Sequence, residues 1–548
     1  MANTKPLAEQ VVFTQAGVGA VARTIADKGR EWVSVKDFGA VGDGVADDTA
    51  AIQATIDSGA NRIYFDSGEY LVSSAIELSG TGIQLYGVAG ATKITSATVK
   101  TIVQLGGLTD AVIDGLVFET SVNSATEFVG GLVSAENVQL SNVRFCFCTF
   151  TAPNSNSNGV KIVNETSATA DRIIFDECTF EGIQRMGVEF QNHEFDGTYR
   201  YFGVVINRCS FKSLGVGAGY GYAISLSGLG RGCVISQCSF DGVKLGIELV
   251  GASETTVTAN KFRNFLAAGK PLSFTGALTM YRNRVDGNTV ETEAPAATYI
   301  WTQQDLVMSG NYWMQGTSEV IFRDVKNSRI SNEYYDTSGV NAVFVEGTST
   351  DNQFISCYIS NARAGTNYAT FRTSGVGTTA TRLIGCHIVQ GTGGVSLDAI
   401  NSAETATTFF HKTGTTSALS NTPMRLGRRV PYGISKTAGA ATMSTSVAID
   451  LGTSSSWVPA VINVRVASAK ADGSGGGYTN NTIFVRHVTG SVEVMGNVVS
   501  GTAANLTITP SVAGNAITLT CTHASVSGPS FGFMWDIDVS STNSPIIS

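Results

Sequence analysis

Charged residues and prolines are both scarce in this chain. Asp, Glu, Lys and Arg make up only 15% of the 548 residues, and only 10 residues are Pro, whereas 61 are Gly. So few charges argue against a disordered chain and against a coiled coil. Few prolines leave strands free to pair, and many glycines allow tight corners. The composition therefore predicts a β-rich protein.

Long apolar runs and clusters of basic residues are missing as well. No apolar run reaches the roughly 18 residues of a membrane span, and no run of Lys and Arg reaches five. The net charge is −8, which disfavours nucleic acid as a partner. The first residues, Met1 to Pro6, lack the apolar core of a secretion signal. We expect neither a nucleic-acid partner nor a membrane partner.

The nine cysteines lack the paired spacing of zinc sites, and their positions form a repeat. The motif Cys-Thr/Ser-Phe begins at Cys148, Cys178, Cys209 and Cys238, with spacings of 30, 31 and 29 residues. Identical small residues that recur at a spacing of one coil are typical of a solenoid, in which each coil buries its faces against its neighbours. Because free Cys is among the most buried residue types, we interpret these residues as an interior column rather than as disulfides or metal ligands.

A second repeat follows each Cys–Phe strand. Its members read apolar–polar–apolar, and alternation along a strand places the outer two residues inward and the middle one outward. The repeat therefore predicts one outward ladder, formed by Lys161, Glu189, Ser225, Glu248 and Ser273.

The repeats divide the chain into three parts. Residues 1–34 precede the solenoid, and Val18, Val21 and Ile25 share a face at helical spacing, which predicts a short seam between subunits. Residues 35–410 form the solenoid. Residues 411–548 contain longer apolar strands between Gly/Ser turns, which predict a β-sandwich cap. An open solenoid end needs such a cap because its last coil leaves a sheet edge bare.

The start of the second part carries the most specific motif. Val35 to Gly44 read VKDFGAVGDG, and Asp47 to Gln53 read DDTAAIQ. A helix is expected here, with Asp48 or Thr49 as N-cap and with Ile52 and Ile56 on one face. The segment resembles the entry segment of pectate-lyase-like β-helices, especially that of bacteriophage tailspikes.

This resemblance implies an all-β, right-handed parallel β-helix and a homotrimer located in a virion tail. It also implies that residues 1–34 attach to a tail or baseplate protein, and that the solenoid recognises and degrades a bacterial surface polysaccharide. Release by host lysis would then replace a secretion signal. The last domain would clamp the trimer or add a second carbohydrate site.

Two coils are longer than the 22 residues that separate Phe240 from Phe262, and their extra residues must leave as loops. The excess falls within 191–202 and 213–220. These segments and the strands beside them hold the candidate substrate-binding residues, which are Lys161, His193, Tyr199, Arg200, Tyr220 and Tyr222.

Hydrolysis of a glycosidic bond commonly needs two carboxyl groups, one protonated and one ionised. Glu189 and Glu248 lie two coils apart on the predicted ladder, about 9.6 Å at about 4.8 Å per coil, at the upper edge of the inverting range. Glu194 and Asp196 offer a closer partner to either, and Asp241 is a further candidate. We expect no cofactor and no metal.

Two alternatives stay open. A polysaccharide lyase would need a cation and a base acting on a uronic acid, from Lys161, Arg185 or Arg200 with His193 or Tyr199. A tail fibre that only binds its receptor would use the same scaffold without turnover, because chemistry depends on the site and not on the fold.

Overall fold

The structure is a computed structural model. It describes residues 7–547 except 100, 123–129, 154–156, 193–197, 216–220, 267–268, 277, 293–296, 317–318, 362–368, 375–377, 379–380, 391–394, 400–407, 412–429, 437–441, 451–457, 471–476, 489–490, 502–505, 514–515, 525–530 and 542–545. The chain divides into unit 1, Met1–Ser273, and unit 2, Phe274–Ser548.

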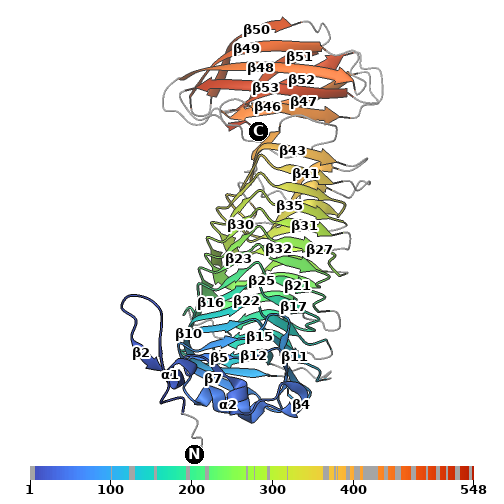
Figure 1. The fold of residues 1–548 in the computed structure, drawn as a ribbon. Coiled ribbons are helices and arrows are strands. Elements are labelled where there is room, and N and C mark those ends of the chain that lie inside the picture. The colour runs from blue at the N-terminus through green and yellow to red at the C-terminus, as the bar shows by residue number, and fades with distance from the viewer. Residues whose placement is uncertain are drawn as a thin grey trace, which may run out of the picture. The chain divides into compact units, whose positions relative to one another are not determined.

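Both units contain the predicted right-handed parallel β-helix (Figure 1). In unit 1 each coil contributes one strand to each of three parallel ladders. The first ladder holds β13 (Leu140–Cys146), β16 (Ala170–Asp176), β20 (Val205–Asn207), β23 (Val234–Ser236) and β26 (Thr256–Thr258). The second holds β14 (Thr149–Thr151), β17 (Thr179–Glu181), β21 (Ser210–Lys212), β24 (Ser239–Asp241) and β27 (Lys261–Arg263). The third holds β12 (Gly131–Glu136), β15 (Asn158–Val163), β18 (Val188–Gln191), β22 (Tyr222–Arg231) and β25 (Leu245–Ser253).

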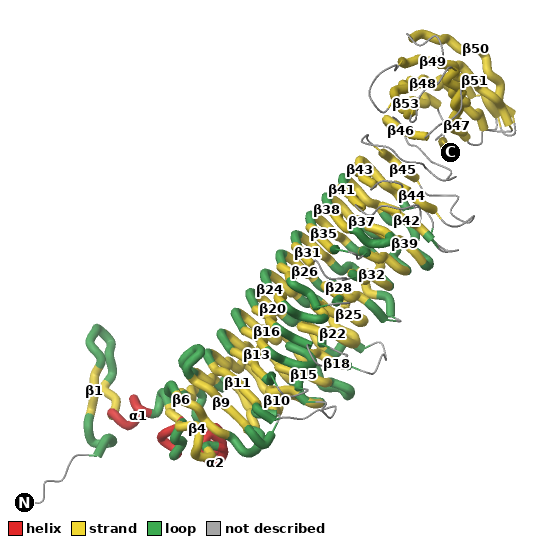
Figure 2. Tube along the Cα trace, turned by 90° about the vertical axis from the view of Figure 1, so that its right-hand side faces the viewer, coloured by secondary structure: helices red, strands yellow, loops and turns green. Residues whose placement is uncertain are grey.

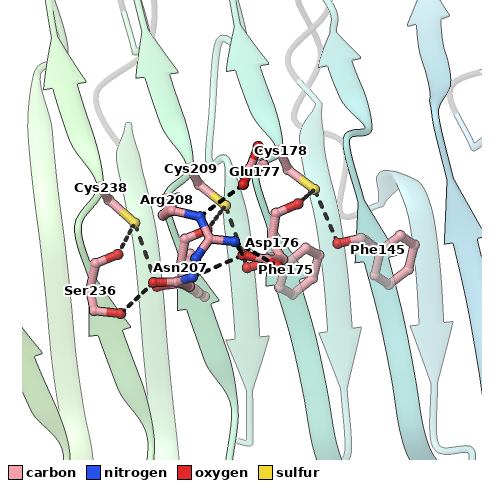
Figure 3. Close-up of polar contacts among 11 residues, drawn as sticks. Phe145, Phe175, Asp176, Glu177, Cys178, Asn207, Arg208, Cys209, Ser236 and Cys238 are labelled. Carbon is pink, nitrogen blue, oxygen red and sulfur yellow. Dashed lines mark hydrogen bonds and ion pairs between the residues drawn. The ribbon is translucent and has the colours of Figure 1, made fainter. Parts of the chain in front are cut away.

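The cysteine column is confirmed. Cys148, Cys178, Cys209 and Cys238 are each 1% exposed, and all are free thiols. Each thiol donates to a carbonyl of the preceding coil, as Cys178 does to Phe145 at 3.3 Å and Cys209 to Phe175 at 3.6 Å (Figure 3). The residue before each of these cysteines has a φ between 51° and 55°, a left-handed conformation that turns the chain from the first ladder into the second.

A column of phenylalanines runs beside the thiols. Phe150, Phe180, Phe211 and Phe240 pair in register, and neighbouring rings stack at 4.8 to 5.0 Å with planes within 9° of parallel. All four are at most 1% exposed. Stacking of identical side chains thus forms the core of each coil against its neighbours.

The entry segment folds as expected around α2 (Thr49–Asp57), which lies near β4 (Asp43–Asp47) and β6 (Gly68–Leu71) (Figure 2). Ile52 and Ile56 are buried. Asp48 is the N-cap residue, but its carboxylate accepts from the Val41 and Gly42 amides rather than from the helix. Gln53 exchanges two hydrogen bonds with the backbone of Glu77 on β7 (Ile76–Thr81), which satisfies polar groups of that strand.

The helical seam predicted in the first part is wrong. β1 (Val12–Thr14) pairs antiparallel with β2 (Ala22–Thr24), and the helix α1 covers only Ile25–Gly29. Val18 lies in the turn between the two strands and Val21 directly before β2, both exposed, so they share no helix face with Ile25. Gly17 and Gly19, both with positive φ, favour this turn over a continuous helix.

In unit 2 the described strands from β30 (Arg284–Asp286) to β45 (Thr408–His411) belong to parallel coils. One ladder holds β32 (Thr298–Trp301), β36 (Val320–Arg323), β39 (Asn341–Glu346) and β42 (Ala369–Thr373). A second ladder holds β31 (Thr289–Thr292), β35 (Tyr312–Gln315), β38 (Tyr334–Thr337) and β41 (Tyr358–Asn361).

The strands after residue 429 form two antiparallel sheets. One has the order β46 (Val430–Lys436), β53 (Phe531–Ser541), β48 (Val458–Lys470), β49 (Gly477–Val488) and β50 (Ser491–Gly501). The other has the order β51 (Leu506–Ala513), β52 (Ala516–Ala524), β47 (Thr442–Asp450) and β54 (Ile546–Ile547). Each sheet has buried apolar residues, such as Ile462 and Leu519. The β-sandwich cap, in which the two sheets would pack face to face, stays a prediction.

Candidate functional site

A row of polar side chains crosses the third ladder of unit 1 in the predicted register. Lys161, Glu189, Ser225 and Glu248 are Cα partners in successive parallel pairs, on β15, β18, β22 and β25. We call these four residues the polar row. Glu189 and Glu248 therefore lie two strands apart, about 9.6 Å along the stack.

The polar row differs from the prediction in its exposure. Lys161 is 2% exposed, Glu189 3% and Ser225 1%, and only Glu248 is half-buried. Alternation along a strand says on which side of the sheet a side chain lies, but not whether other segments cover that side. Buried charges require partners, since desolvation is costly, and the row supplies them.

Glu189 has a cation and an amide donor beside it. The Lys161 ammonium lies 3.6 Å from Glu189 Oε2, and the side-chain amide of Asn158 donates to the same oxygen. Asn158 is held in turn, because its Oδ1 accepts from the Met186 amide at 3.2 Å. Burial lowers the pKa of Lys161, while the charge of Glu189 opposes this shift.

Glu248 lies in a different environment. Burial raises the pKa of its carboxyl group, and the negative charge of Glu189 adds to the rise. The Ser225 hydroxyl donates to Glu248 Oε2 at 2.7 Å, and the Tyr222 hydroxyl also hydrogen-bonds this carboxyl group, which opposes the shift. One row thus holds two carboxyl groups with different neighbours, because Lys161 and Asn158 lie beside Glu189 and Ser225 lies beside Glu248.

The remaining candidates are distributed as follows. His193, Glu194, Asp196 and Tyr220 lie outside the described residues. Asp241 is exposed on β24, in the second ladder, where it accepts from Asn264, so it does not join the polar row. Tyr222 is 8% exposed and contacts the row through Glu248.

Tyr199 belongs to a second group on the same sheet, with Phe202, Arg231 and Glu254. The Arg231 guanidinium lies 6.0 Å from the centroid of the Tyr199 ring, and Glu254 binds it with both oxygens, at 2.5 and 2.9 Å. The Phe202 ring is 6.4 Å from that of Tyr199. Arg200 lies between Tyr199 and Phe202 in the sequence and is buried.

Arg231 and Glu254 were not among the residues predicted from the sequence. They are 23 residues apart, about one plain coil, and this spacing could have revealed them. β22 carries both Ser225 and Arg231, but its register shifts between them and Gly228 has a φ of 101°, so the strand is not straight from one group to the other.

Among the described residues, neither a cluster of metal-binding side chains nor a membrane-spanning helix is found. Within the described parts of the chain, no three His, Cys, Asp or Glu side chains gather as metal ligands would. No helix there is both long and apolar enough to cross a bilayer.

The coiled architecture defines a right-handed parallel β-helix protein. Within that class, residues 32–270 match the family model described as rhamnogalacturonase A/epimerase, pectate lyase-like. The solved Dettilon tailspike protein aligns with a TM-score of 0.51 at 10% identity, over 94% of this chain and 96% of that one. At this identity the alignment shows a shared fold.

Curated relatives match only short stretches. The mannuronan C5-epimerase AlgE5 of Azotobacter vinelandii is 58% identical over 50 residues, which cover 8% of this chain and 5% of that protein. Plasmin and fibronectin-binding protein A of Streptococcus pneumoniae is 35% identical over 155 residues, 24% of this chain and 20% of that protein. The chain therefore spans only a small part of each.

Proposed function

We propose that this protein is a phage tailspike that binds and hydrolyses a bacterial surface polysaccharide, a capsule or an O-antigen. The observation that carries this proposal is the pair Glu189 and Glu248, two strands apart in one row and with different neighbours. The epimerase and pectate lyase-like matches support a polysaccharide as the substrate class. The entry motif and the tailspike fold support a virion tail, with residues 1–34 as the attachment segment.

In this mechanism the Glu248 carboxyl group, whose pKa is raised by burial, is the general acid and donates its proton to the glycosidic oxygen. Glu189 is the general base and accepts a proton from a water molecule, whose oxygen attacks the anomeric carbon from the opposite face. The glycosidic C–O bond breaks, and the products are a new reducing end and a free hydroxyl. Asn158 and Lys161 hold Glu189, and Ser225 and Tyr222 orient Glu248. Since Glu248 is the half-buried member, the glycan would enter from its side.

A lyase reaction is the second candidate, and the buried Lys161 favours it. A lysine whose pKa is lowered by burial can act as a base, and a uronic acid offers an acidic proton next to its carboxylate. Elimination would leave an unsaturated sugar that absorbs ultraviolet light, whereas hydrolysis would not. A binding-only tail fibre would produce neither signal.

The test is to incubate the full chain with purified capsules and lipopolysaccharides from many bacterial strains. New reducing ends and ultraviolet absorbance would be measured together. Reducing ends without absorbance are expected. Both signals together would replace hydrolysis by elimination, and a polysaccharide that binds but yields neither product would leave only receptor binding.

Two substitutions test the proposed roles of Glu189 and Glu248 in turnover. Glu189→Gln and Glu248→Gln should each lower turnover by at least about 100-fold, since each removes an acid or a base, while binding is retained. Glu181→Gln is the matched control, because Glu181 is an exposed carboxylate on β17 in the second ladder. Full turnover by either of the first two variants would remove that residue from the mechanism.

A further inference from the structure

One face of unit 2 gathers aromatic and charged side chains. The alternate residues of β32, β36, β39 and β42 are half-buried, whereas their neighbours Ile300, Phe322 and Val345 lie in the core. The strand register forms two columns, one of Tyr299, Ile321, Phe344 and Arg372 and the other of Trp301, Arg323 and Glu346. We call these seven residues the aromatic face.

Arg323 is fixed at the centre of this face. Its guanidinium lies 4.5 Å from the centroid of the Trp301 ring, on the strand before it. On the strand after it, Glu346 Oε1 lies 2.6 Å from Arg323 Nη2. The Arg323 side chain nevertheless keeps 41% of its surface exposed, against 18% for Glu346. Because stacking and the ion pair fix the guanidinium, its remaining donors point to solvent at little further cost in side-chain entropy.

The other members add ring surface and a second cation. The Tyr299 and Trp301 rings meet edge to face, with centroids 5.1 Å apart and planes at 89°. Arg372 lies 5.8 Å from the centroid of the Phe344 ring. Neighbouring strands are about 4.8 Å apart, so the face spans four strands, about 14 Å, a length comparable with that of two or three sugar rings.

We propose that the aromatic face is a second, non-catalytic carbohydrate-binding surface, which holds an extended oligosaccharide across the coils of unit 2. Sugars combine apolar C–H faces with hydroxyl groups, and aromatic rings beside a fixed guanidinium match both. The group Tyr199, Arg231 and Glu254 in unit 1 repeats the same arrangement, with an arginine over a ring and bound by a glutamate of a later coil. Only the substrate class is shared with the proposed function, because no residue of the polar row takes part.

A glycan fits the face better than another protein or a nucleic acid would. Aromatic residues and Arg are common in protein interfaces, but Glu is depleted there, and Glu346 lies at the centre of the face in an ion pair with Arg323. Nucleic acid would face a chain of net charge −8.

The experiment uses the full chain with Glu248→Gln, so that polysaccharide is bound without turnover. Retention on immobilised capsules and lipopolysaccharides from the same strains is compared with that of the same chain carrying Trp301→Ala or Arg323→Ala. Each should weaken retention about tenfold. Arg323→Lys should recover only part of the loss, since an ammonium group keeps the charge but not the planar stacking. Tyr281→Ala is the matched control, because Tyr281 is an aromatic of unit 2 that is 41% exposed and lies outside the face.

In the chain with Glu248 intact, reducing ends from short fragments should form at the same rate with and without Trp301→Ala. Unchanged retention in both variants, or an equal loss with Tyr281→Ala, would overturn the second surface and leave the proposed function untouched. Retention that depends on Trp301 without any product would keep the second surface and overturn hydrolysis. A lower mass in light scattering for Trp301→Ala would make the face a contact between copies and overturn the proposal. Retention of no polysaccharide would overturn both.

Discussion

At the scale of single residues, the least expected feature is Glu333. It follows Asn332, whose φ is 54°, and so occupies the corner position that cysteines take in other coils. It is 1% exposed, and its carboxyl group accepts from the Asn311 side chain at 2.9 Å and from the Trp313 indole at 2.7 Å. Burial raises the pKa of Glu333 to about 8, against the opposing effect of these donors. Glu333 thus places a buried carboxyl group at a corner where other coils place a Cys thiol or an Asn amide.

Glu333 makes the stability of unit 2 depend on pH. Between the ordinary carboxyl pKa and about 8, the folded chain keeps a proton that the unfolded chain releases, so the free energy of unfolding falls as pH rises through this range. Above about pH 8 this contribution no longer changes. Glu333→Gln should flatten the dependence, whatever its effect on stability at any one pH.

The measurement is thermal unfolding of the full chain from pH 5 to 9, followed by circular dichroism. Asp336→Asn is the control, because Asp336 is a half-exposed carboxylate on the strand that follows Glu333. It should keep the slope of the parent. An unchanged slope in Glu333→Gln would contradict the assignment.

The same reasoning gives a pH dependence for the proposed reaction. Burial raises the pKa of Glu248, so a general acid at this position stays protonated at a higher pH than an exposed carboxyl group does. Turnover should therefore persist above the pH at which an ordinary glutamate has lost its proton, and then decline. The decline would be followed in a pH–rate profile of reducing-end formation. Replacing Ser225 by Ala removes a hydrogen bond that opposes the shift, and should move the decline to higher pH.

At the scale of elements, the phenylalanine column of unit 1 makes the coils depend on one another. Phe211 is fully buried and stacks on Phe180 at 4.9 Å and on Phe240 at 5.0 Å. Phe211→Ala would open a cavity between two flat rings that cannot collapse into it. We expect a loss of about 3 to 5 kcal/mol, and a smaller loss for Phe211→Leu.

Denaturant unfolding with a far-ultraviolet signal would measure the loss. Phe147→Ala serves as the control, because Phe147 is 49% exposed at a corner of the same stack, and its effect should stay within about 0.5 kcal/mol. Equal effects of the two substitutions would show that the column adds nothing beyond local contacts.

At the scale of the whole molecule, the resemblance to tailspikes predicts a homotrimer. Light scattering of the full chain should give three times the mass of 57.3 kDa. The exposed apolar residues of the first segment, Val12, Val18 and Val21, are candidates for part of the contact, although not as the helical seam first expected. A mass of one chain would refute the trimer.

The features of the fold and of the candidate site that could be predicted are those that repeat in the sequence. The thiol column, the strand register of Lys161, Glu189, Ser225 and Glu248, and helix α2 could be read directly, because a solenoid places residues one coil apart side by side. The same rule, applied at 23 residues, would also have found the group of Arg231 and Glu254. The shape of residues 12–24 could not be inferred, since three apolar residues at helical spacing say nothing of a glycine turn between them.

The amino-acid sequence by itself determined the parallel β-helix and the order of its ladders, because period and alternation are local properties that a stack merely repeats. Only the tertiary structure decided which outward positions are buried and that Arg323 lies over Trp301. It also decided that Glu189 contacts Lys161 and Asn158, whereas Glu248 contacts Ser225 and Tyr222. The physical reason is that burial and the dielectric surroundings of a charge depend on every segment that covers it, and no spacing along the chain encodes that cover.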